Sequence, residues 1–313
     1  MEKDLILMGS HALKKAAVNE EAKQYILNNE ALFKTLKKAA DRYIGGETLE
    51  ETIPKVKLHN AKGFKCSVEF MGENTVTEKE ANEATNEFIN IVKQTNKHQL
   101  YSTVSLDLSH IGLAVSRELG LYNLKRICEE AQQGNIEVII SAEGVEATDA
   151  VIDTYKSCVK VYDNVGITLQ AYLYRTEDDF KDLVTEKGRI RIVKGAFDTP
   201  QELAMPRGKD LDNAYLNYID QLLAINHKCS IATHHDFIQK EAEKLIQHHQ
   251  ADKRVYEFES LFGIQNEQLE LLKDKGHPAK VYFVYGKEWY LYLCNRIAEY
   301  PLNLFRALND ILS

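Results

Sequence analysis

Residues 101–141 read YSTVSLDLSHIGLAVSRELGLYNLKRICEEAQQGNIEVIIS and contain one complete strand–helix–strand unit. The first run, 101–107, and the last run, 136–141, are rich in β-branched residues, which is typical of strands. Between them, residues 118–132 place apolar side chains at helical spacing. Parallel strands need a crossover connection of this length, so the stretch predicts a βαβ unit of a parallel sheet.

The same alternation extends on both sides of this unit. The predicted strands are 65–71, 101–107, 136–141, 165–172, 189–195, 229–234, 255–261 and 279–285. The predicted helices are 78–93, 118–132, 146–159, one within 173–188, 210–226, 237–249, 266–274 and 287–299, the first with a capping box of Thr77 and Glu80. Eight such units predict an α/β fold, a (β/α)8 TIM-like barrel. A doubly wound sheet is the alternative, but no GxGxxG motif follows a strand, which disfavours a dinucleotide site.

The N-terminal part of the chain has a different pattern, because apolar residues follow helical spacing without a strand-like run. Gly45 and Gly46 interrupt the pattern, and Pro54 is predicted to lie in a linker. We therefore expect an N-terminal helical segment over residues 1–60 and a barrel over residues 61–313. The last predicted helix should lie over the barrel mouth as a C-terminal helix.

Composition excludes several classes of protein. The 313 residues carry 39 Lys and Arg against 47 Asp and Glu, a net charge of −8, which disfavours nucleic acid as a partner. Five widely spaced cysteines without a CxxC motif indicate buried free thiols in a reducing compartment. The N-terminus lacks a signal-peptide pattern and no run is long enough to span a bilayer, so we expect a cytoplasmic protein.

The carboxyl ends of the predicted strands, where barrels carry their chemistry, are unusually polar. They hold Glu69, Glu73, Asp107, Ser109, Ser141, Glu143, Gln170, Tyr172, Arg191, Lys194, Gly195, His234, His235, Asp236, Glu257, Glu259 and Tyr285. The cations Arg191 and Lys194 suit an anionic or electron-rich cofactor, on which they would stabilise negative charge. A structural ion pair with a strand carboxylate is the alternative.

The adjacent His234 and His235 suggest a metal site at first sight. Neighbouring residues of a strand point to opposite faces, so the two imidazoles cannot comfortably bind one ion, and no other Cys/His spacing completes a site. We therefore predict no metal.

One face of the last predicted helix gathers polar and aromatic side chains. Helical spacing places Tyr292, Asn295, Arg296 and Glu299 together, with Arg296 able to pair with Glu299. We expect this face to cover the barrel mouth, and an ordinary salt-bridged surface is the alternative.

These motifs together resemble those of the proline dehydrogenase family. The segment 191–197, RIVKGAF, resembles that family's RLVKGAY motif. Similar segments follow the family's order at 63–73 (GFKCSVEFMGE), 169–172 (LQAY), 231–234 (IATH), 256–264 (YEFESLFGI), 285–289 (YGKEW) and in the pattern Tyr292-x-x-x-Arg296-x-x-Glu299. The resemblance covers roughly residues 44–301.

The resemblance implies a distorted, flavin-binding catalytic barrel that holds FAD non-covalently and passes a hydride from the carbon beside a secondary amine to flavin N5. In the family, proline becomes 1-pyrroline-5-carboxylate and the electrons pass to a membrane quinone. On the matching positions, Arg191 would lie near N5 and Gln170 near the pyrimidine end. The cofactor would also be lined by Lys194, Gly195, Ala196, Thr233, His234, Glu259 and Glu299. Tyr282, Tyr292, Arg296 and Glu299 would shape the substrate side.

The chain departs from the family where the family holds the carboxylate of proline. The family uses a lysine on the second strand, an aspartate partner on the third and two adjacent arginines on the last helix. These positions here are Asp107, Ser141 and the pair Asn295-Arg296, and Phe197 replaces the final tyrosine of RLVKGAY. Removing one member of a charge clamp costs about 2–5 kcal/mol.

We therefore expect a proline derivative or a related cyclic amine as the substrate. The catalytic residues implied are Arg191, Tyr282, Tyr292, Arg296, Asp107, Asn295 and Ser141. The alternatives are a genuine L-proline dehydrogenase with a rearranged clamp, and a non-catalytic flavin-binding relative.

The expected electron acceptor is a quinone or oxygen. A quinone-linked enzyme needs at least transient membrane contact, which would make this cytoplasmic protein peripheral on the inner face of the membrane. An apolar C-terminal stripe could supply that contact or pack on the barrel; it comprises Leu302, Leu304, Phe305, Leu308, Ile311 and Leu312.

Overall fold

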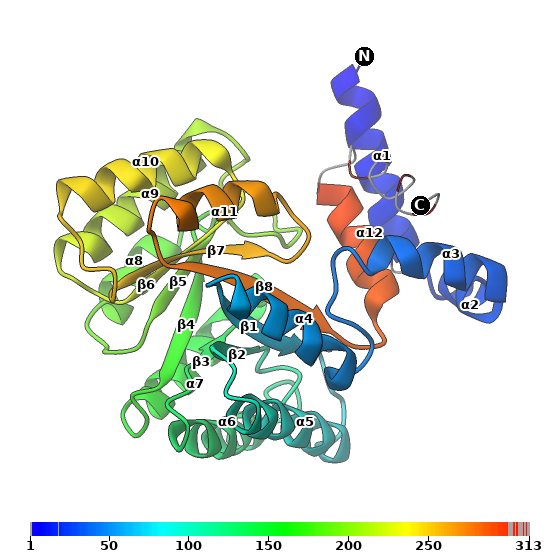
Figure 1. The fold of residues 1–313 in the computed structure, drawn as a ribbon, viewed down its shortest axis with the longest axis horizontal. Helices are drawn as coiled ribbons and strands as arrows, with labels where there is room; N and C mark the ends of the chain where they lie inside the picture. The colour runs from blue at the N-terminus through cyan, green and yellow to red at the C-terminus, as the bar shows by residue number, and fades with distance from the viewer. Residues whose placement is uncertain are drawn as a thin grey trace.

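The computed structural model describes residues 2–17 and 19–299 and, beyond these, residues 303, 305, 309 and 311. Eight parallel strands form a closed barrel in the order β1 to β8 (Figure 1). The strands are β1 (Lys65–Phe70), β2 (Ser102–Leu106), β3 (Val138–Ile140), β4 (Val165–Gln170), β5 (Ile190–Val193), β6 (Cys229–Ala232), β7 (Tyr256–Leu261) and β8 (Ala279–Tyr285). The predicted (β/α)8 barrel is confirmed, although most strands end earlier than expected.

Helices alternate with these strands, and all but the last of them surround the barrel (Figure 1). They are α5 (Glu78–Lys97), α6 (Arg117–Gln132), α7 (Thr148–Val159), α8 (Thr176–Leu183), α9 (Lys209–Ala224), α10 (Asp236–His248), α11 (Asn266–Asp274) and α12 (Trp289–Glu299). A 3-10 turn, Val145–Ala147, precedes α7. The capping box predicted at Thr77 and Glu80 is present at the start of α5.

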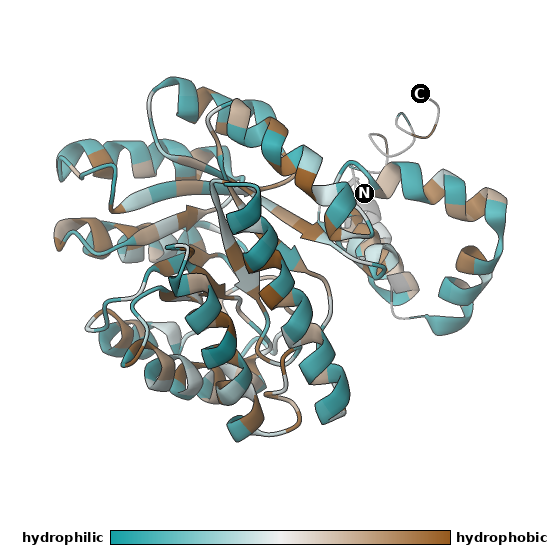
Figure 2. Ribbon diagram, turned by 60° about the horizontal axis from the view of Figure 1, so that its bottom comes forward, coloured by the Kyte–Doolittle hydropathy of each residue, from teal (hydrophilic) through white to brown (hydrophobic). Residues whose placement is uncertain are grey.

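Successive side chains of each strand point alternately outward, towards the helices, and inward, and this alternation explains how the barrel packs. Residues such as Val104, Ile140 and Ile192 are fully buried between the strands and the surrounding helices. Their neighbours in sequence, such as Ser105 and Arg191, are also buried but bond to one another across the barrel interior. The helices turn their hydrophilic faces outward (Figure 2). The barrel therefore has an apolar outer core and a polar interior.

A second hydrophobic cluster lies beside the barrel, where the helices α1 (Glu2–Ala17) and α3 (Glu30–Ala40) pack against α12 and are joined by α2 (Glu20–Asn28) (Figure 1). Trp289 and Leu293 of α12 are buried in it. Ser10 Oγ donates to the carbonyl of Ala298 at 2.7 Å. The N-terminal helices thus hold the helix that follows the last strand.

The prediction that Pro54 lies in a linker is wrong, because it lies inside α4 (Leu49–Ala61). Thr48 caps this helix by accepting from the backbone N–H of Glu51 at 3.3 Å. Proline inside a helix removes one backbone hydrogen bond. Ile53 and Val56 are nevertheless buried in the barrel core, so the helix persists through tertiary packing.

All five cysteines are buried and free, as predicted. None of the described helices combines the length and the apolar character needed to cross a membrane. Of the C-terminal apolar stripe, Phe305 is exposed and Ile311 is half-buried, while Leu302, Leu304, Leu308 and Leu312 lie outside the described residues.

Candidate active site

Arg191 on β5 lies at the centre of the polar barrel interior. Its Nε donates to Thr168 Oγ1 at 2.8 Å. Its terminal nitrogens donate to Ser141 Oγ at 3.1 Å, and to Ser105 Oγ and Glu259 Oε1 at 3.2 Å each. Burial alone would lower the pKa of Arg191, but the Glu259 carboxylate holds that pKa above its usual value. The structure therefore contains one fixed, permanently charged guanidinium at this level of the barrel.

A second network connects β1, β3 and β8 next to Arg191. The hydroxyl of Tyr282 donates to Glu69 Oε2, and Ser141 Oγ donates to the same oxygen at 2.9 Å. The Tyr282 ring centre lies 5.0 Å from the guanidinium carbon of Arg191. Glu69 Oε1 accepts no hydrogen bond from the described residues. Burial raises the pKa of the Glu69 carboxyl, although the hydrogen bond from Tyr282 opposes this.

Several carboxyl groups lie close to Glu69 at the mouth. Asp107 is half-buried beyond the end of β2, and within the described part of the chain its side chain has no hydrogen bond or ion pair. Burial raises the pKa of Asp107 well above its usual value, and the charges of Glu69, Glu143 and Glu73 raise it further. Glu143 accepts from the backbone N–H of Ser109 at 3.1 Å, and burial raises its pKa as well.

Helix α12 covers the mouth, as predicted. Arg296 donates to Glu299 Oε1 at 2.5 Å, and its guanidinium carbon lies 5.0 Å from the ring centre of Tyr292. Burial lowers the pKa of His234 to about 4, with further lowering by the positive charge of Arg296, so this arginine faces the end of β6. Asn295, on the same helix, is half-buried.

The loops after β5 and β6 are rich in cations. Lys194 pairs with Asp212 on α9 and lies 2.9 Å from His235 Nδ1. Arg191 thus pairs with a carboxylate on a strand, Glu259, whereas Lys194 pairs with a carboxylate on a helix.

The neighbouring backbone is shaped by glycine. Gly195 has φ of +107°, and a Cβ there would lie 2.2 Å from the Tyr172 ring, so only glycine fits. Ala196 is exposed and Thr233 is half-buried; Thr233 Oγ1 accepts from the N–H of His235 at 3.1 Å. Gln170 at the end of β4 donates to the carbonyl of Glu143 at 2.9 Å.

These residues fit an anionic flavin on one half of the mouth. The positive charges of Arg296, Arg207 and Lys194 all lower the pKa of His234, which shows that they converge on one region. The Nε of Arg296 is buried without a hydrogen-bond partner among the described residues. The cationic half of the mouth therefore has unused donors and positive charge, while the half around Asp107 has excess carboxyl groups.

Below the mouth lies a layer of charges that we call the floor: Lys65, Glu137, Arg189, Glu257 and Lys280. Glu257 pairs with Lys280 at 2.6 Å and Lys65 at 3.4 Å. Glu137 pairs with Lys65 at 2.9 Å and Arg189 at 3.1 Å. The prediction that Glu257 lies at the mouth is therefore wrong. Glu257 comes two residues before Glu259 on β7 and lies deeper in the barrel, among the floor charges.

Sequence reasoning missed several residues of the interior network. Ser105, Thr168 and Lys280 all lie before the last residue of β2, β4 and β8, so a rule that selects strand ends passes over them. The alternation of inward and outward residues would have found them. Glu69 was noted at a strand end but not assigned to the site.

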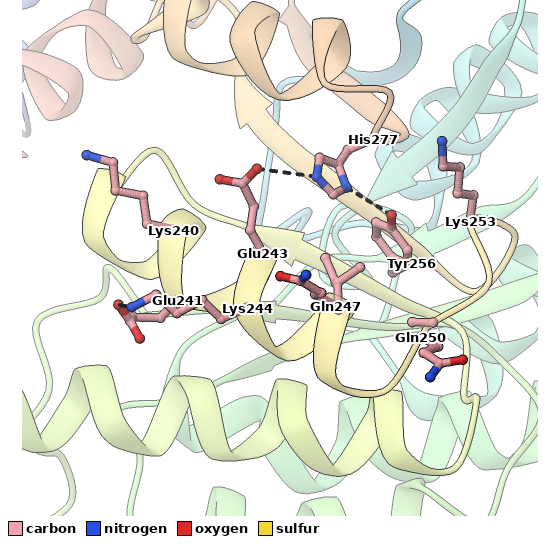
Figure 3. Close-up of a pocket in the computed structure, with 11 residues that line it drawn as sticks. Lys240, Glu241, Glu243, Lys244, Gln247, Gln250, Lys253, Tyr256 and His277 are labelled. Carbon is pink, nitrogen blue, oxygen red and sulfur yellow. Dashed lines mark hydrogen bonds and ion pairs between the residues drawn. The ribbon is translucent and has the colours of Figure 1, made fainter.

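Two surface cavities lie outside this network. A cavity of about 490 Å³ beside the mouth is lined by residues that include Phe70, Glu73 and His110. Another, of about 710 Å³, lies along α10 and the start of β7 (Figure 3). There, His277 contacts the Tyr256 hydroxyl at 2.9 Å and the Glu243 carboxylate at 3.3 Å. No residue of the predicted site lines this second cavity.

Comparison with known proteins agrees with the fold and the motifs. The family model described as proline dehydrogenase matches residues 52–300. Proline dehydrogenase 1 of Bacillus subtilis strain 168 is 33% identical over 273 residues, covering 87% of this chain and 90% of the relative. The proline dehydrogenase of Deinococcus radiodurans is 29% identical over 278 residues, with the same coverages.

Solved structures give the same architecture. The crystal structure of proline utilization A from Bdellovibrio bacteriovorus, inactivated by N-propargylglycine, superposes with a TM-score of 0.82 at 19% identity. The match covers 96% of this chain but 37% of that longer chain, and it supports the fold alone.

Proposed function

Because the chain belongs to the proline dehydrogenase family and is therefore an oxidoreductase acting on a CH–NH group, we propose that it oxidises a cyclic secondary amine other than free L-proline. The expected substrates are proline derivatives whose carboxylate is absent or modified, and related cyclic amines. FAD, when bound, would supply the hydride acceptor.

The residues proposed to hold the cofactor come from both the interior and the cationic half of the mouth. They are Gln170, Arg191, Lys194, Gly195, Ala196, Thr233, His234, Glu259 and Glu299. Arg191 is the group best suited to stabilise negative charge, because four hydrogen bonds fix its orientation. Tyr282, Tyr292 and Arg296 would contact the substrate.

The observation that carries the substrate proposal is the unpaired carboxyl group of Asp107. It lies among Glu69, Glu143 and Glu73, whose charges already raise its pKa. A substrate carboxylate brought to this position would meet several like charges in a partly buried site, where such contacts cost several kcal/mol. An amine without a free carboxylate meets no such cost.

One observation favours L-proline as the second candidate. Arg296 faces the mouth, and its buried Nε has no hydrogen-bond partner among the described residues, so it could hold one carboxylate. The relatives at 29–33% identity are named proline dehydrogenases.

An anaerobic titration separates these candidates. The purified protein, loaded with FAD, is mixed with excess L-proline and, separately, with pyrrolidine or a proline ester, and the visible flavin band is followed. Bleaching by the amine or ester but only slowly by L-proline supports the proposal. Rapid bleaching by L-proline overturns it in favour of the second candidate.

A variant provides the matched test of the charge argument. The triple change Asp107→Lys, Ser141→Asp and Asn295→Arg restores the family's clamp. We expect kcat/KM for L-proline to rise at least tenfold and that for pyrrolidine to fall. No gain for L-proline would contradict the role given to Asp107.

The proposal extends to the electron acceptor and to the division of the chain. The electron acceptor is a quinone or oxygen, and a quinone would bring the protein into transient contact with the inner face of the membrane. We propose a division into an N-terminal helical segment over residues 1–60 and a barrel over residues 61–313, with Ile53 and Val56 of the first segment packed in the barrel core.

A further inference from the structure

We propose that Glu69 and Asp107 form a carboxyl pair that binds the ammonium group of the substrate and accepts its proton before oxidation. This inference rests on the proposed function and adds to it the group that prepares the amine. It gives Glu69 a catalytic role as the proton acceptor and Asp107 the role of a second acceptor of an N–H.

The chemistry requires such a group. An alkyl ammonium has a pKa near that of lysine, about 10.4, so a secondary amine arrives protonated at neutral pH. Its carbon cannot give up a hydride in that form, because the nitrogen lone pair must form the C=N bond as the hydride leaves. One N–H bond must therefore break first, with its electrons remaining on nitrogen and the proton passing to a base.

Glu69 has the geometry of that base. Its Oε2 accepts from Tyr282 and Ser141, which fixes the carboxyl group in one orientation. Its Oε1 accepts nothing from the described residues, and the side chain is half-exposed at the mouth. Tyr282 cannot take this role, because its hydroxyl proton is directed at Glu69. The free Oε1 is thus the acceptor left for a substrate N–H.

The groups that face the pair show why it attracts a cation. Glu69 is surrounded by Tyr282 on β8, Arg191 on β5, Glu259 on β7, Asp107 after β2 and Tyr292 on α12. Asp107 faces Glu69, Glu143, Glu73 and Arg191. The single cation in this set, Arg191, already bonds to Glu259, Ser105, Ser141 and Thr168.

This balance predicts the protonation of the pair. Two neighbouring carboxyl groups without a free cation do not both ionise readily, so one of them holds a proton. The hydrogen bonds from Tyr282 and Ser141 favour the ionised form of Glu69, which leaves the proton on Asp107. An incoming ammonium binds the ionised Glu69; its N–H bond breaks with the electrons left on nitrogen, and the proton passes to Glu69 Oε1. The amine is then neutral and ready for oxidation.

The test uses the flavin-loaded protein and its variants Glu69→Gln and Asp107→Asn. At saturating pyrrolidine and pH 7, we expect the rate of flavin reduction in Glu69→Gln to fall roughly 100-fold or more, as for loss of a general base. The rate should recover towards wild type above the pKa of the free amine, about 10–11, because the substrate then arrives neutral. Glu83→Gln, an exposed carboxylate on α5, is the control and should retain the wild-type profile.

A binding measurement that does not depend on turnover complements the measured rates of flavin reduction. A pyrrolidine with both carbons next to nitrogen fully methylated cannot be oxidised, so it reports only binding. Infrared difference spectra on its addition should show a new protonated carboxyl band in wild type and none in Glu69→Gln.

The possible results distinguish the proposed function from the proton-acceptor role of Glu69. A wild-type flavin that no cyclic amine reduces at any pH overturns the proposed function. A flavin that is reduced, with the same pH profile in Glu69→Gln and in wild type, overturns the proton-acceptor role alone. A loss in Glu69→Gln that is equal at every pH assigns Glu69 to structure and also overturns that role.

Discussion

The floor and the mouth of the barrel contain the same kinds of side chain at different depths. At the floor, Lys65, Arg189 and Lys280 surround Glu137 and Glu257, and these cations hold the pKa of both carboxyl groups below the usual value despite burial. At the mouth, burial and like charges raise the pKa of Glu69 and Asp107.

The difference teaches which charges support the fold and which leave room for a ligand. Floor carboxylates have their partners inside the chain, so they stabilise the folded state when ionised. Mouth carboxyl groups lack such partners, and their ionisation opposes folding. Perturbed, unpaired groups in a cleft are the expected mark of a functional site.

Among the tests of this comparison, we expect the largest effect for Glu257→Gln at the floor. Removing the Glu257 charge leaves Lys280 with Glu259 and Arg189 with Glu137 as their remaining carboxylates, in a buried layer with excess positive charge. We therefore expect a loss of about 3 kcal/mol in the free energy of unfolding. Denaturant unfolding measures it, with the exposed Glu270→Gln as the control. A loss no greater than that of the control would mean that the floor is not stabilising.

A second test uses pH. Arg189 and Lys65 lower the pKa of Glu137 to about 2 from 4.5 despite burial, so its contribution is complete above pH 4.5 and is lost as the pH falls towards 2. Glu137→Gln should flatten the acid branch of stability by up to about 1.4 kcal/mol per pH unit. Unchanged acid unfolding would contradict the pairing.

At the mouth the sign is reversed. The pKa of Asp107 is raised in the folded state, so stability is lost as the pH rises through that raised value. Asp107→Asn should therefore increase stability at pH 7 by about 1 kcal/mol, and the gain should vanish below pH 3.8. The exposed Asp163→Asn serves as the control, and a destabilised Asp107→Asn would reverse our interpretation of the mouth.

The smallest expected effect concerns the polar contact at the opposite end of β7. Tyr256→Phe removes one hydrogen bond to His277, and we expect a loss of about 0.5 kcal/mol. Thermal unfolding at neutral pH measures this change. A loss as large as that of Glu257→Gln would show that the outer contact belongs to the floor.

The sequence predicts the barrel well because strand and helix periods are local. The strand-end rule likewise finds Arg191, Asp107 and Ser141 from position alone. It cannot separate Glu257 from Glu259, since both point inward and their depth depends on the register of eight strands. It also misplaces Pro54, because the contacts that keep α4 helical come from distant parts of the chain.

The contact between α1 and α12 has a consequence for synthesis. Ser10 of α1 bonds to Ala298 of α12, and Lys23 pairs with Glu288 just before that helix. During translation, α1 is made long before α12. The first helix therefore lacks its contact with α12 until the whole barrel has been synthesised. Tyr292 and Arg296 can therefore be positioned over the mouth only after α12 has been made, and the candidate site is complete only when helices from both ends of the described chain pack together.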